Sequence, residues 1–370
     1  MITPNKSSIP RVSIVVPTYQ EADNITVLVT EINRVMDSES IDYELVFVDD
    51  DSQDGSQSLC RKLSVDYPVR MITRHGERGL ATAVVRGIEE SSGQYIVVMD
   101  ADLSHPPSAI PSMLELLIDD QSDFVVGSRY VDGGSIHGNW TTWRRLNSRL
   151  PTWLVKPLTP IRDPMSGFFA LRRCQVPDSK RFNAIGYKIG LEIYVKGEFT
   201  NPVEVPIHFA ERQNGVSKLG LLEQLSFLRH LRRLYQYRFP RFSELLQFAG
   251  IGATGFVVDL SVYLSLQLVF SMDHRVARAI SFFVAASWNW GGNRIVTFPH
   301  RPKTPKLKQW PIFLATSAIG FVVNWGSYVL LTTYVPFFDR HKIVALLIGV
   351  LLGMGVNFLG AHKIAFRRAQ

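Results

Sequence analysis

Short apolar runs alternate with amphipathic segments over the first 220 residues of the chain. The runs have the length of strands and are rich in β-branched residues, which is typical of strands buried on both faces of a sheet. Between them, apolar residues recur at helical spacing, as at Ile25, Leu28, Val29 and Ile32. Strands are predicted at 12–16, 43–48, 69–73, 94–99, 123–127 and 203–209. The alternation predicts an α/β domain with a mostly parallel sheet and helices on both faces.

Charged residues become rare after about residue 245, where four long apolar stretches follow one another. Each is longer than the ~20 residues needed to cross the hydrocarbon core of a bilayer. We therefore predict membrane-spanning helices at 245–270, 276–298, 311–335 and 343–366. Buried helices of a large soluble domain are the alternative, and the short connections between four successive spans argue against it.

The net charge of the chain is +7, and basic residues gather beside the predicted spans. Because cytoplasmic loops carry an excess of Lys and Arg, their positions place the large domain and both termini in the cytoplasm. The pattern indicates attraction to a membrane surface rather than to nucleic acid. The basic residues are Arg229, Arg232, Arg233, Arg238 and Arg241 before the first span, Arg294, Arg301, Lys303, Lys306 and Lys308 between the second and third, and Lys363, Arg367 and Arg368 after the fourth.

Two further features concern the compartment of the chain. Residues 1–10 are polar, so we expect no signal peptide. Cys60 and Cys174 are the only cysteines, so we expect no disulfide framework, and a reducing cytosol suits the large domain.

Acidic residues stand where two of the predicted strands end. Asp49, Asp50 and Asp51 follow the second strand, and Asp100 and Asp102 follow the fourth. Because ligands bind at the carboxyl ends of parallel strands, we expect these acids to converge on one crevice. Asp100 and Asp102 are two positions apart and can point the same way, which suits a divalent cation. A solvated polar turn is the alternative in both places. The chain has no Gly-x-Gly-x-x-Gly or Gly-x-x-x-x-Gly-Lys-Ser/Thr loop, which argues against a dinucleotide-binding enzyme and a P-loop ATPase.

Seven short motifs occur in order along the large domain. They are VPTYQE (16–21), VDDDS (48–52), GLATA (79–83), DADLSHP (100–106), GSRY (127–130), DPMSGFF (163–169) and GVSKL (215–219). Together they resemble the motifs of family 2 glycosyltransferases with the GT-A fold, and most closely those of polyprenyl-phosphate (dolichyl-phosphate) mannosyltransferases. The resemblance covers residues 11–220. It implies a GT-A catalytic domain over 1–220, amphipathic interfacial helices over 221–243 and a transmembrane domain over 244–370.

The resemblance implies a nucleotide site along the carboxyl edge of the sheet. A polar turn with a helix cap is the alternative for the acids at 49–51. Arg212 and Lys218, with Ser217, would form a loop that closes over the diphosphate, and a basic membrane-facing loop is the alternative. The nucleotide-binding residues implied are Pro17, Tyr19, Glu21, Val48, Asp50, Gly79, Asp100, Ala101, Arg212 and Lys218.

The resemblance also implies a cofactor, Mg²⁺ or Mn²⁺, held by Asp100 and Asp102 and bridging the diphosphate. Ser104 is a third candidate ligand. Some relatives have Gln at this position and Ser is shorter, so a water molecule between Ser104 and the metal is the alternative. His105, in the same motif, is expected to be structural.

Arginines are the candidates for the acceptor phosphate, because their planar forks match phosphate oxygens. Arg129 and Arg144 are assigned to it, together with Ser166, while surface arginines are the alternative and Arg145 and Arg149 are rivals nearby. Asp163 is expected to orient the sugar or the acceptor phosphate. The catalytic residues implied are therefore Asp100, Asp102, Arg129, Arg144 and Asp163.

The expected reaction is inverting transfer of mannose from GDP-mannose to a polyprenyl (dolichyl) phosphate at the cytoplasmic membrane face. A lipid monophosphate is already an anion, so no general base is needed, and the charge of the leaving diphosphate is the main barrier. UDP-glucose or another sugar nucleotide as donor is the near alternative, and a lipid carrier or flippase is the distant one. The chain has no Gln-x-x-Arg-Trp motif, which argues against a processive polysaccharide synthase.

The membrane half contains an internal repeat. GFVVD (255–259) matches GFVVN (320–324), and 289–298 matches 357–366 more loosely. Two copies of a helical hairpin are therefore expected, an arrangement that resembles the GtrA-like membrane domain. Asp259 lies inside a predicted span, where a charge is costly and commonly functional. Its repeat partner is Asn324, so a structural hydrogen bond between helices is the alternative.

Overall fold

The structure is a computed structural model that describes residues 11–136, 151–182, 188–209, 221–299, 301 and 304–367. The chain divides into two compact units, Met1–Arg238 and Phe239–Gln370. Each described unit has its own cluster of buried apolar residues.

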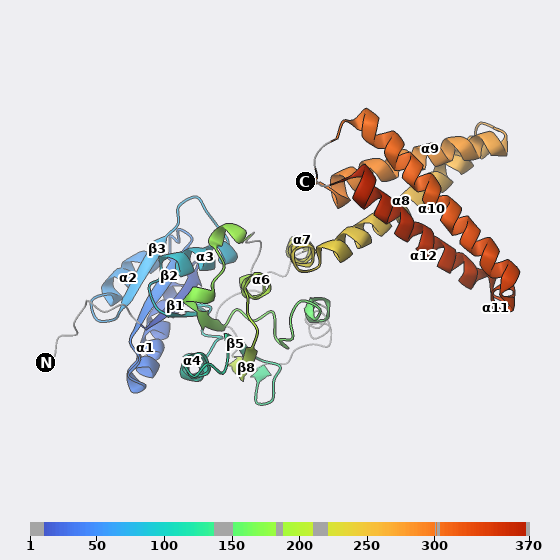
Figure 1. Ribbon diagram of the computed structural model, residues 1–370. Coiled ribbons are helices and arrows are strands. Elements are labelled where there is room, and N and C mark those ends of the chain that lie inside the picture. The colour runs from blue at the N-terminus through green and yellow to red at the C-terminus, as the bar shows by residue number, and fades with distance from the viewer. Residues whose placement is uncertain are drawn as a thin grey trace. The chain divides into compact units, whose positions relative to one another are not determined.

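A mostly parallel sheet forms the centre of the first unit (Figure 1). In the described residues its strand order is β3-β2-β1-β4-β7-β5-β8, with β7 antiparallel to both of its neighbours and the other pairs parallel. The strands are β1 (Val12–Thr18), β2 (Tyr43–Asp49), β3 (Val69–Thr73), β4 (Tyr95–Val98), β5 (Phe124–Ser128), β7 (Phe169–Arg172) and β8 (Pro202–Pro206). The α/β fold class is confirmed, and β7 is the strand of this sheet that the sequence pattern did not predict.

Helices cover both faces of this sheet (Figure 1). On one face, α1 (Ala22–Ser38), α2 (Ser56–Leu63) and α4 (Ile110–Ile118) contribute to a buried cluster with alternate strand residues. On the other face, α3 (Leu80–Glu90) and α6 (Ile189–Lys196) pack on the intervening ones. This double cover explains why all seven residues of β1 are buried and why its sequence shows no polar alternation. The short strands β6 (Ser135–Ile136) and β9 (His208–Phe209) form a separate pair.

The last helix of the first unit is α7 (Leu221–Arg238). Its residues Leu231 and Leu234 are buried against Leu191 and Val195 of α6. Its other side leaves apolar and basic side chains exposed, among them Leu225, Leu228, Arg229 and Arg232. This is the composition of a helix that lies on a membrane surface, and the interfacial position stays a prediction.

The second unit is helical, with α8 (Pro240–Leu268), α9 (His274–Gly292), α10 (Lys306–Tyr334), the short α11 (Pro336–Arg340) and α12 (Lys342–Gly360). Among the described residues, three helices are long and apolar enough to cross a membrane: Pro240–Leu268, Lys306–Tyr334 and Lys342–Ala365. The second predicted span, 276–298, corresponds to α9, which does not meet this criterion. Arg275, Arg278 and Asn289 lower its mean hydropathy.

The matching sequences of the second unit occupy matching places in two helix pairs, α8 with α9 and α10 with α12. Gly255 of α8 faces the amide of Asn289, and Gly320 of α10 faces the amide of Asn357, each so closely that a Cβ on the glycine would clash. Both second helices then end in a π-helical turn, Asn293–Thr297 in one and Ala361–Ala365 in the other. The phenylalanines that follow, Phe298 and Phe366, stack with ring centroids 4.8 Å apart.

Candidate active site

Tyr19 and the predicted acids after the second and fourth strands lie at the carboxyl ends of three adjacent strands. The order β2-β1-β4 places the ends of these strands side by side. Thr18 pairs with Asp49, so Tyr19 and Asp50 begin the loops just beyond the sheet. The acids of the fourth strand follow Val98, which pairs with Val15. This is the edge at which open α/β sheets bind their ligands.

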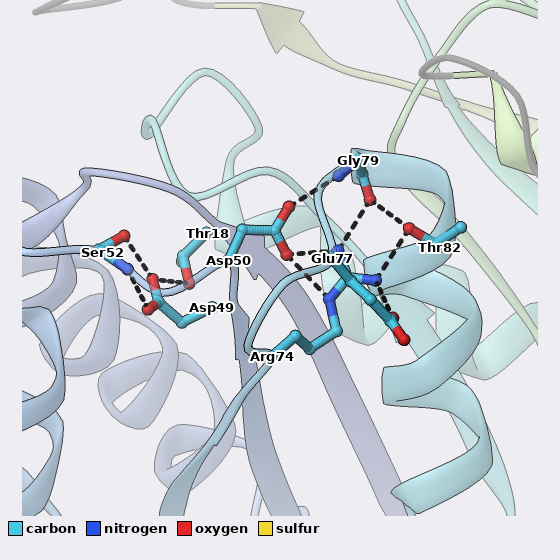
Figure 2. A network of polar contacts seen from close by, with 8 residues as sticks. All are labelled: Thr18, Asp49, Asp50, Ser52, Arg74, Glu77, Gly79 and Thr82. Carbon is cyan, nitrogen blue, oxygen red and sulfur yellow. Dashed lines mark hydrogen bonds and ion pairs between the residues drawn. The ribbon is translucent and has the colours of Figure 1, made fainter.

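Asp49 shapes the turn that follows β2. Its carboxylate is fully buried and accepts hydrogen bonds from the Ser52 N–H (2.8 Å) and the Ser52 hydroxyl (2.6 Å), with a longer one from Thr18 (3.4 Å) (Figure 2). Ser52 Oγ in turn accepts the N–H of Gln20 at 2.8 Å. Side chains of Asp commonly bond to the backbone of their own turn in this way. Asp49 thus joins the loop after β1 to the loop after β2.

Asp50 is the centre of a second network, which reaches the start of α3 (Figure 2). Its Oδ1 accepts bonds from Nε (2.8 Å) and Nη2 of Arg74, and its Oδ2 accepts the N–H of Gly79 (2.8 Å). Arg74 also donates to the carbonyl of Gly79 (3.0 Å) and to Thr82 Oγ1 (2.8 Å). Gly79 has φ of +141°, which favours glycine at this position. Both members of the Asp50–Arg74 pair are buried.

Arg74 is a site residue that the sequence interpretation missed. It follows β3, the neighbour of β2, so its position beside the acid that follows β2 could have been expected from a parallel sheet. Arg74 holds Oδ1 and the Gly79 N–H holds Oδ2 of Asp50, the residue assigned to the nucleoside base.

The remaining nucleotide candidates differ in what they present to the crevice. The ring of Tyr19 is 40% exposed, and the Arg78 guanidinium lies 4.8 Å from its centroid. Glu21 Oε2 accepts a hydrogen bond from Asn24 at 2.7 Å. Pro17 and Val48 are buried in the sheet, and Val48 belongs to the cluster under α3. The side chain of Val48 is therefore not available to a ligand, and all four nucleotide contacts stay predictions.

The two acids after β4 have different surroundings. The Asp100 side chain is 27% exposed, and among the described residues no hydrogen bond reaches its carboxylate; His105 Nδ1 lies 3.9 Å from Oδ2. Asp102 is buried, and its Oδ1 accepts the N–H (3.1 Å) and the hydroxyl (2.5 Å) of Ser104. Ala101, between them, is buried in the core. The Ser104 hydroxyl is therefore directed at Asp102.

His105 lies behind this motif and is 2% exposed. Its Nδ1 accepts the backbone N–H of Asp100 at 3.1 Å, and its ring stacks on Phe168 with centroids 5.2 Å apart. Burial lowers the pKa of His105, while Asp100 and Asp102 act in the opposite direction. A neutral imidazole that accepts from the backbone orients the turn, which is the structural place that the sequence predicts for His105.

Arg129 and Asp163 form a buried ion pair at the end of β5. Asp163 is fully buried, and its Oδ2 accepts Nε (2.7 Å) and the backbone N–H (3.1 Å) of Arg129, while Oδ1 accepts Nη2 (2.8 Å). Burial acts to lower the pKa of Arg129, but the hydrogen bonds and charge of Asp163 outweigh it, so the pKa is raised. The guanidinium is therefore a permanent cation held in one orientation.

Ser166 and Gly167 continue the turn that begins at Asp163. Ser166 Oγ donates to the carbonyl of Gly127 at 2.8 Å. A Cβ on Gly167 would lie 3.3 Å from Asp100 Oδ1. The turn therefore lies beside Asp100 as well as beside Arg129, and the assignment of Ser166 to the acceptor phosphate stays a prediction.

Three basic candidates cannot be placed. Arg144, Arg212 and Lys218, and with them Ser217, lie outside the described residues, as do the rivals Arg145 and Arg149. Within the described residues there is no cluster of three or more His, Cys, Asp or Glu side chains that could hold a metal ion. A cation at Asp100 and Asp102 would therefore complete its coordination with other oxygens, such as those of a phosphate or water.

Comparison with known proteins gives two family matches. The model of glycosyl transferase family 2 matches residues 13–176, and that of the GtrA/DPMS transmembrane domain matches residues 247–366. A solved structure of glucosyl-3-phosphoglycerate synthase from Mycobacterium tuberculosis covers 62% of this chain and 79% of its own at 18% identity and a TM-score of 0.45, a likeness too weak to carry an argument.

Curated relatives extend over more of the chain. A dolichol-phosphate mannosyltransferase of Pyrococcus furiosus is 36% identical over 354 residues, which are 94% of this chain and 97% of the relative. Proteins of the same name from Mycosarcoma maydis and Saccharomyces cerevisiae are 42% and 40% identical over 63% and 61% of this chain, and 82% and 88% of their own. The motifs predicted this family correctly: the chain belongs to glycosyl transferase family 2 and, within it, to the family of these dolichol-phosphate mannosyltransferases.

Proposed function

We propose that this chain transfers mannose from GDP-mannose to the phosphate of a polyprenyl (dolichyl) phosphate, with inversion at the anomeric carbon. The observation that carries the proposal is the similarity to the Pyrococcus furiosus dolichol-phosphate mannosyltransferase over almost the whole of both chains. Because the similarity includes the membrane unit, it supports a lipid acceptor as well as a sugar nucleotide donor.

The donor would lie along the ends of β1, β2 and β4. Tyr19 offers an exposed ring for the nucleoside, and Asp50, fixed by Arg74, forms the wall of the base site. The oxygen Oδ2 of Asp50 accepts one bond, from Gly79, so it retains capacity for one N–H donor of a base. This rigid wall supports binding of a planar base.

The residues present fit a hard divalent cation, Mg²⁺ or Mn²⁺. Asp100 is partly exposed and its carboxylate accepts no hydrogen bond from the described residues, while Asp102 is fixed by Ser104 two positions away. These carboxylates would hold the cation, and Ser104 would orient Asp102 rather than coordinate directly. The bound cation would neutralise charge that develops on the leaving nucleoside diphosphate.

The acceptor would bind near Arg129. A lipid monophosphate brings an anionic oxygen that attacks the anomeric carbon without losing a proton to the protein. Arg129, a permanent cation, would hold this phosphate, with Arg144 as its expected partner from outside the described residues. Attack on the face opposite the nucleotide would convert an α-linked donor into β-mannosyl phosphate.

The catalytic unit and both termini would lie in the cytoplasm, where sugar nucleotides are made. The basic residues beside the predicted spans support this orientation. Cys174 is exposed and Cys60 is buried, so an impermeant maleimide should label the chain in inside-out membrane vesicles and not in intact cells. Labelling in intact cells would contradict the orientation and leave the reaction unaffected.

The reaction is tested with purified full-length protein, a short polyprenyl phosphate and labelled GDP-mannose, with UDP-glucose in parallel. We expect a mannosyl lipid that requires Mg²⁺ or Mn²⁺, that disappears with EDTA, and that Asp102→Ala does not form. Asp119→Ala, an exposed acid at the end of α4, is the matched control and should be fully active. A glucosyl lipid alone would overturn the donor, and no product from any sugar nucleotide would favour the lipid-carrier alternative.

A further inference from the structure

A short turn, residues 163–167, touches both parts of the proposed catalytic crevice. Its first residue, Asp163, binds Arg129 through three hydrogen bonds. Its last residue, Gly167, approaches Asp100 so closely that a Cβ there would lie 3.3 Å from the carboxylate. The turn therefore sets the distance between the cation assigned to the acceptor and the acid assigned to the metal.

Asp163 itself is not accessible to a substrate. Its side chain has no exposed surface, and both oxygens already accept N–H groups of Arg129. A general base must come within hydrogen-bond reach of the proton that it removes, so Asp163 in this arrangement cannot serve as one. The carboxylate that lies nearest to Arg129 is thus directed at Arg129 alone.

The pair leaves one edge of Arg129 for a ligand. Nε and Nη2 bind Asp163, and within the described part of the chain no hydrogen bond involves Nη1. The guanidinium carbon lies 5.4 Å from the ring centroid of Tyr130 and 5.1 Å from that of Phe209. Two aromatic faces and a bidentate carboxylate together fix the plane of the guanidinium.

Further contacts hold Asp163 from behind. Glu204 of β8 accepts the backbone N–H groups of Arg162 (2.8 Å) and Asp163 (2.9 Å). Ser166 bonds from its backbone N–H to the carbonyl of Asp163 (3.2 Å) and from its hydroxyl to Gly127 of β5 (2.8 Å). The turn is thus fastened to two parallel strands, which makes Asp163 a rigid support.

We infer that Asp163 is a positioning residue for Arg129: it orients the guanidinium so that its remaining edge meets the acceptor phosphate, and it neither contacts the substrate nor takes a proton. The inference rests on the proposed function, because it requires an acceptor with a phosphate group. It changes the role that the sequence interpretation gave to Asp163, which was to orient the substrate directly.

A double-mutant cycle tests this inference on the full-length protein, with the wild type, Asp163→Asn, Arg129→Ala and the double variant. Asp163→Asn should lower kcat/KM for the polyprenyl phosphate by about 10- to 100-fold, the range for a lost hydrogen bond to a charged group, and mainly through KM. Because Asp163 acts through Arg129, kcat/KM of the double variant should lie within about twofold of the value for Arg129→Ala alone. The affinity for GDP should stay at the wild-type value in all four proteins.

The matched control is Asp120→Asn, which breaks the exposed pair with Arg172 and should leave all constants unchanged. Effects of the two single substitutions that multiply in the double variant would overturn the inference. So would an Asp163→Asn enzyme that loses kcat, keeps its acceptor KM and loses the pH dependence of its rate, because that is the behaviour of a general base.

Two further measurements cover the remaining outcomes. If Asp163→Asn fails to bind GDP and is therefore misfolded, the variant Glu204→Gln takes its place, because it loosens the same turn. Glu204→Gln should raise the KM for the acceptor by a smaller factor. An unchanged KM would contradict the inference. If the wild type forms no mannosyl lipid, the proposed function fails. The same four proteins are then compared by equilibrium binding of farnesyl phosphate, with farnesol as the control ligand that lacks a phosphate. Losses of binding free energy that add up in the double variant would again overturn the role of Asp163.

Discussion

The acids that follow β2 and the acids that follow β4 occupy equivalent places in the sheet, yet the protein surrounds them differently. β1 separates the two strands, and both pairs lie at its carboxyl edge. Asp49 and Asp50 are buried, and every oxygen of the two carboxylates accepts a hydrogen bond from the protein (Figure 2). Asp102 is also buried and is held by Ser104, but Asp100 is partly exposed, and its carboxylate accepts no hydrogen bond from the described residues.

This difference indicates two roles. Asp49, Asp50 and their hydrogen-bonding partners, which we call the frame, hold the loops in place, whereas Asp100 is available to bind a ligand. A buried carboxylate whose oxygens are all engaged fixes the loops around it, and removing its partner leaves an uncompensated charge. A partly buried carboxylate without hydrogen bonds adds little to folding and is available to a cation. The comparison therefore predicts large activity effects at one strand end and large stability effects at the other.

The largest effect is expected for Asp100→Asn. Loss of the charge proposed to hold the metal should lower kcat by about 10³-fold or more, because charge stabilisation by a metal amounts to several kcal/mol. The unfolding midpoint should stay within about 2 °C of the wild type, since no hydrogen bond to the carboxylate is lost. Mannosyl transfer and differential scanning fluorimetry measure the two quantities. A lower unfolding midpoint without loss of mannosyl transfer would mean that Asp100 supports the fold rather than the reaction.

The second effect concerns the frame, and Arg74→Ala breaks it. The substitution leaves Asp50 buried without its partner, which should cost about 3 kcal/mol of the free energy of unfolding, at the low end for a broken buried pair. For a unit of this size that lowers the unfolding midpoint by about 6–12 °C. Arg86→Ala removes the exposed ion pair with Glu90 on α3 and is the matched control, with a shift near zero.

Replacing both members of this pair sharpens the comparison. The double variant Asp50→Leu with Arg74→Met removes both charges and should recover much of the lost stability. It should still bind GDP poorly, since the wall of the proposed base site is gone. A double variant that binds GDP as the wild type does would contradict the assignment of Asp50 to the base.

The third effect is on metal affinity. Because the described residues offer two carboxylates and no larger ligand cluster, Mn²⁺ alone should bind weakly. Phosphate oxygens of GDP would complete the coordination, so the dissociation constant of Mn²⁺ should fall at least about tenfold when GDP is present. Electron paramagnetic resonance titration of free Mn²⁺ measures it. Equal affinity with and without GDP would indicate a further protein ligand.

The sequence predicted the first unit well where one local rule decides the structure. Six strands of the main sheet were predicted because each is a short run rich in β-branched residues and bounded by turn residues, although β3 and β8 are only partly buried. β7 was missed because it begins at Phe169, the last residue of the DPMSGFF motif, and four residues carry little periodic signal. Its place between β4 and β5 depends on long-range pairing, which no local pattern contains.

The same limit applies to the site. Motif spacing predicted which acids stand at the strand ends, since that follows from chain order alone. It did not include the partners of these acids: the place of Arg74 beside Asp50 follows only from the pairing of β2 with β3, and the Asp163–Arg129 pair joins segments 34 residues apart. Partners of this kind decide whether an acid supports the fold or meets a ligand.

The smallest effect is expected at Asp54, an exposed acid near the buried Asp49 and Asp50. This exposed carboxylate accepts N–H groups of Ser56 (3.1 Å) and Ala22 (3.0 Å) and so joins the starts of α2 and α1. Burial acts to raise the pKa of Asp54, but its hydrogen bonds with Ser56 and Ala22 outweigh it, so the pKa is lowered. A lowered pKa means that the stabilisation is present above the unfolded value of about 3.9 and is lost as pH falls through the folded value.

Asp54→Asn should therefore speed hydrogen exchange of the α2 amides slightly at neutral pH, and the difference from the wild type should be smaller in acid, below the unfolded pKa. Ser56→Ala removes the hydroxyl that donates to Asp54 at 2.7 Å and should show part of the same effect. A difference equally large at both pH values would mean that the shape of the side chain, rather than its charge, holds the two helices. Asp54 would then differ from the buried acids of the frame, whose contribution depends on the charges they pair.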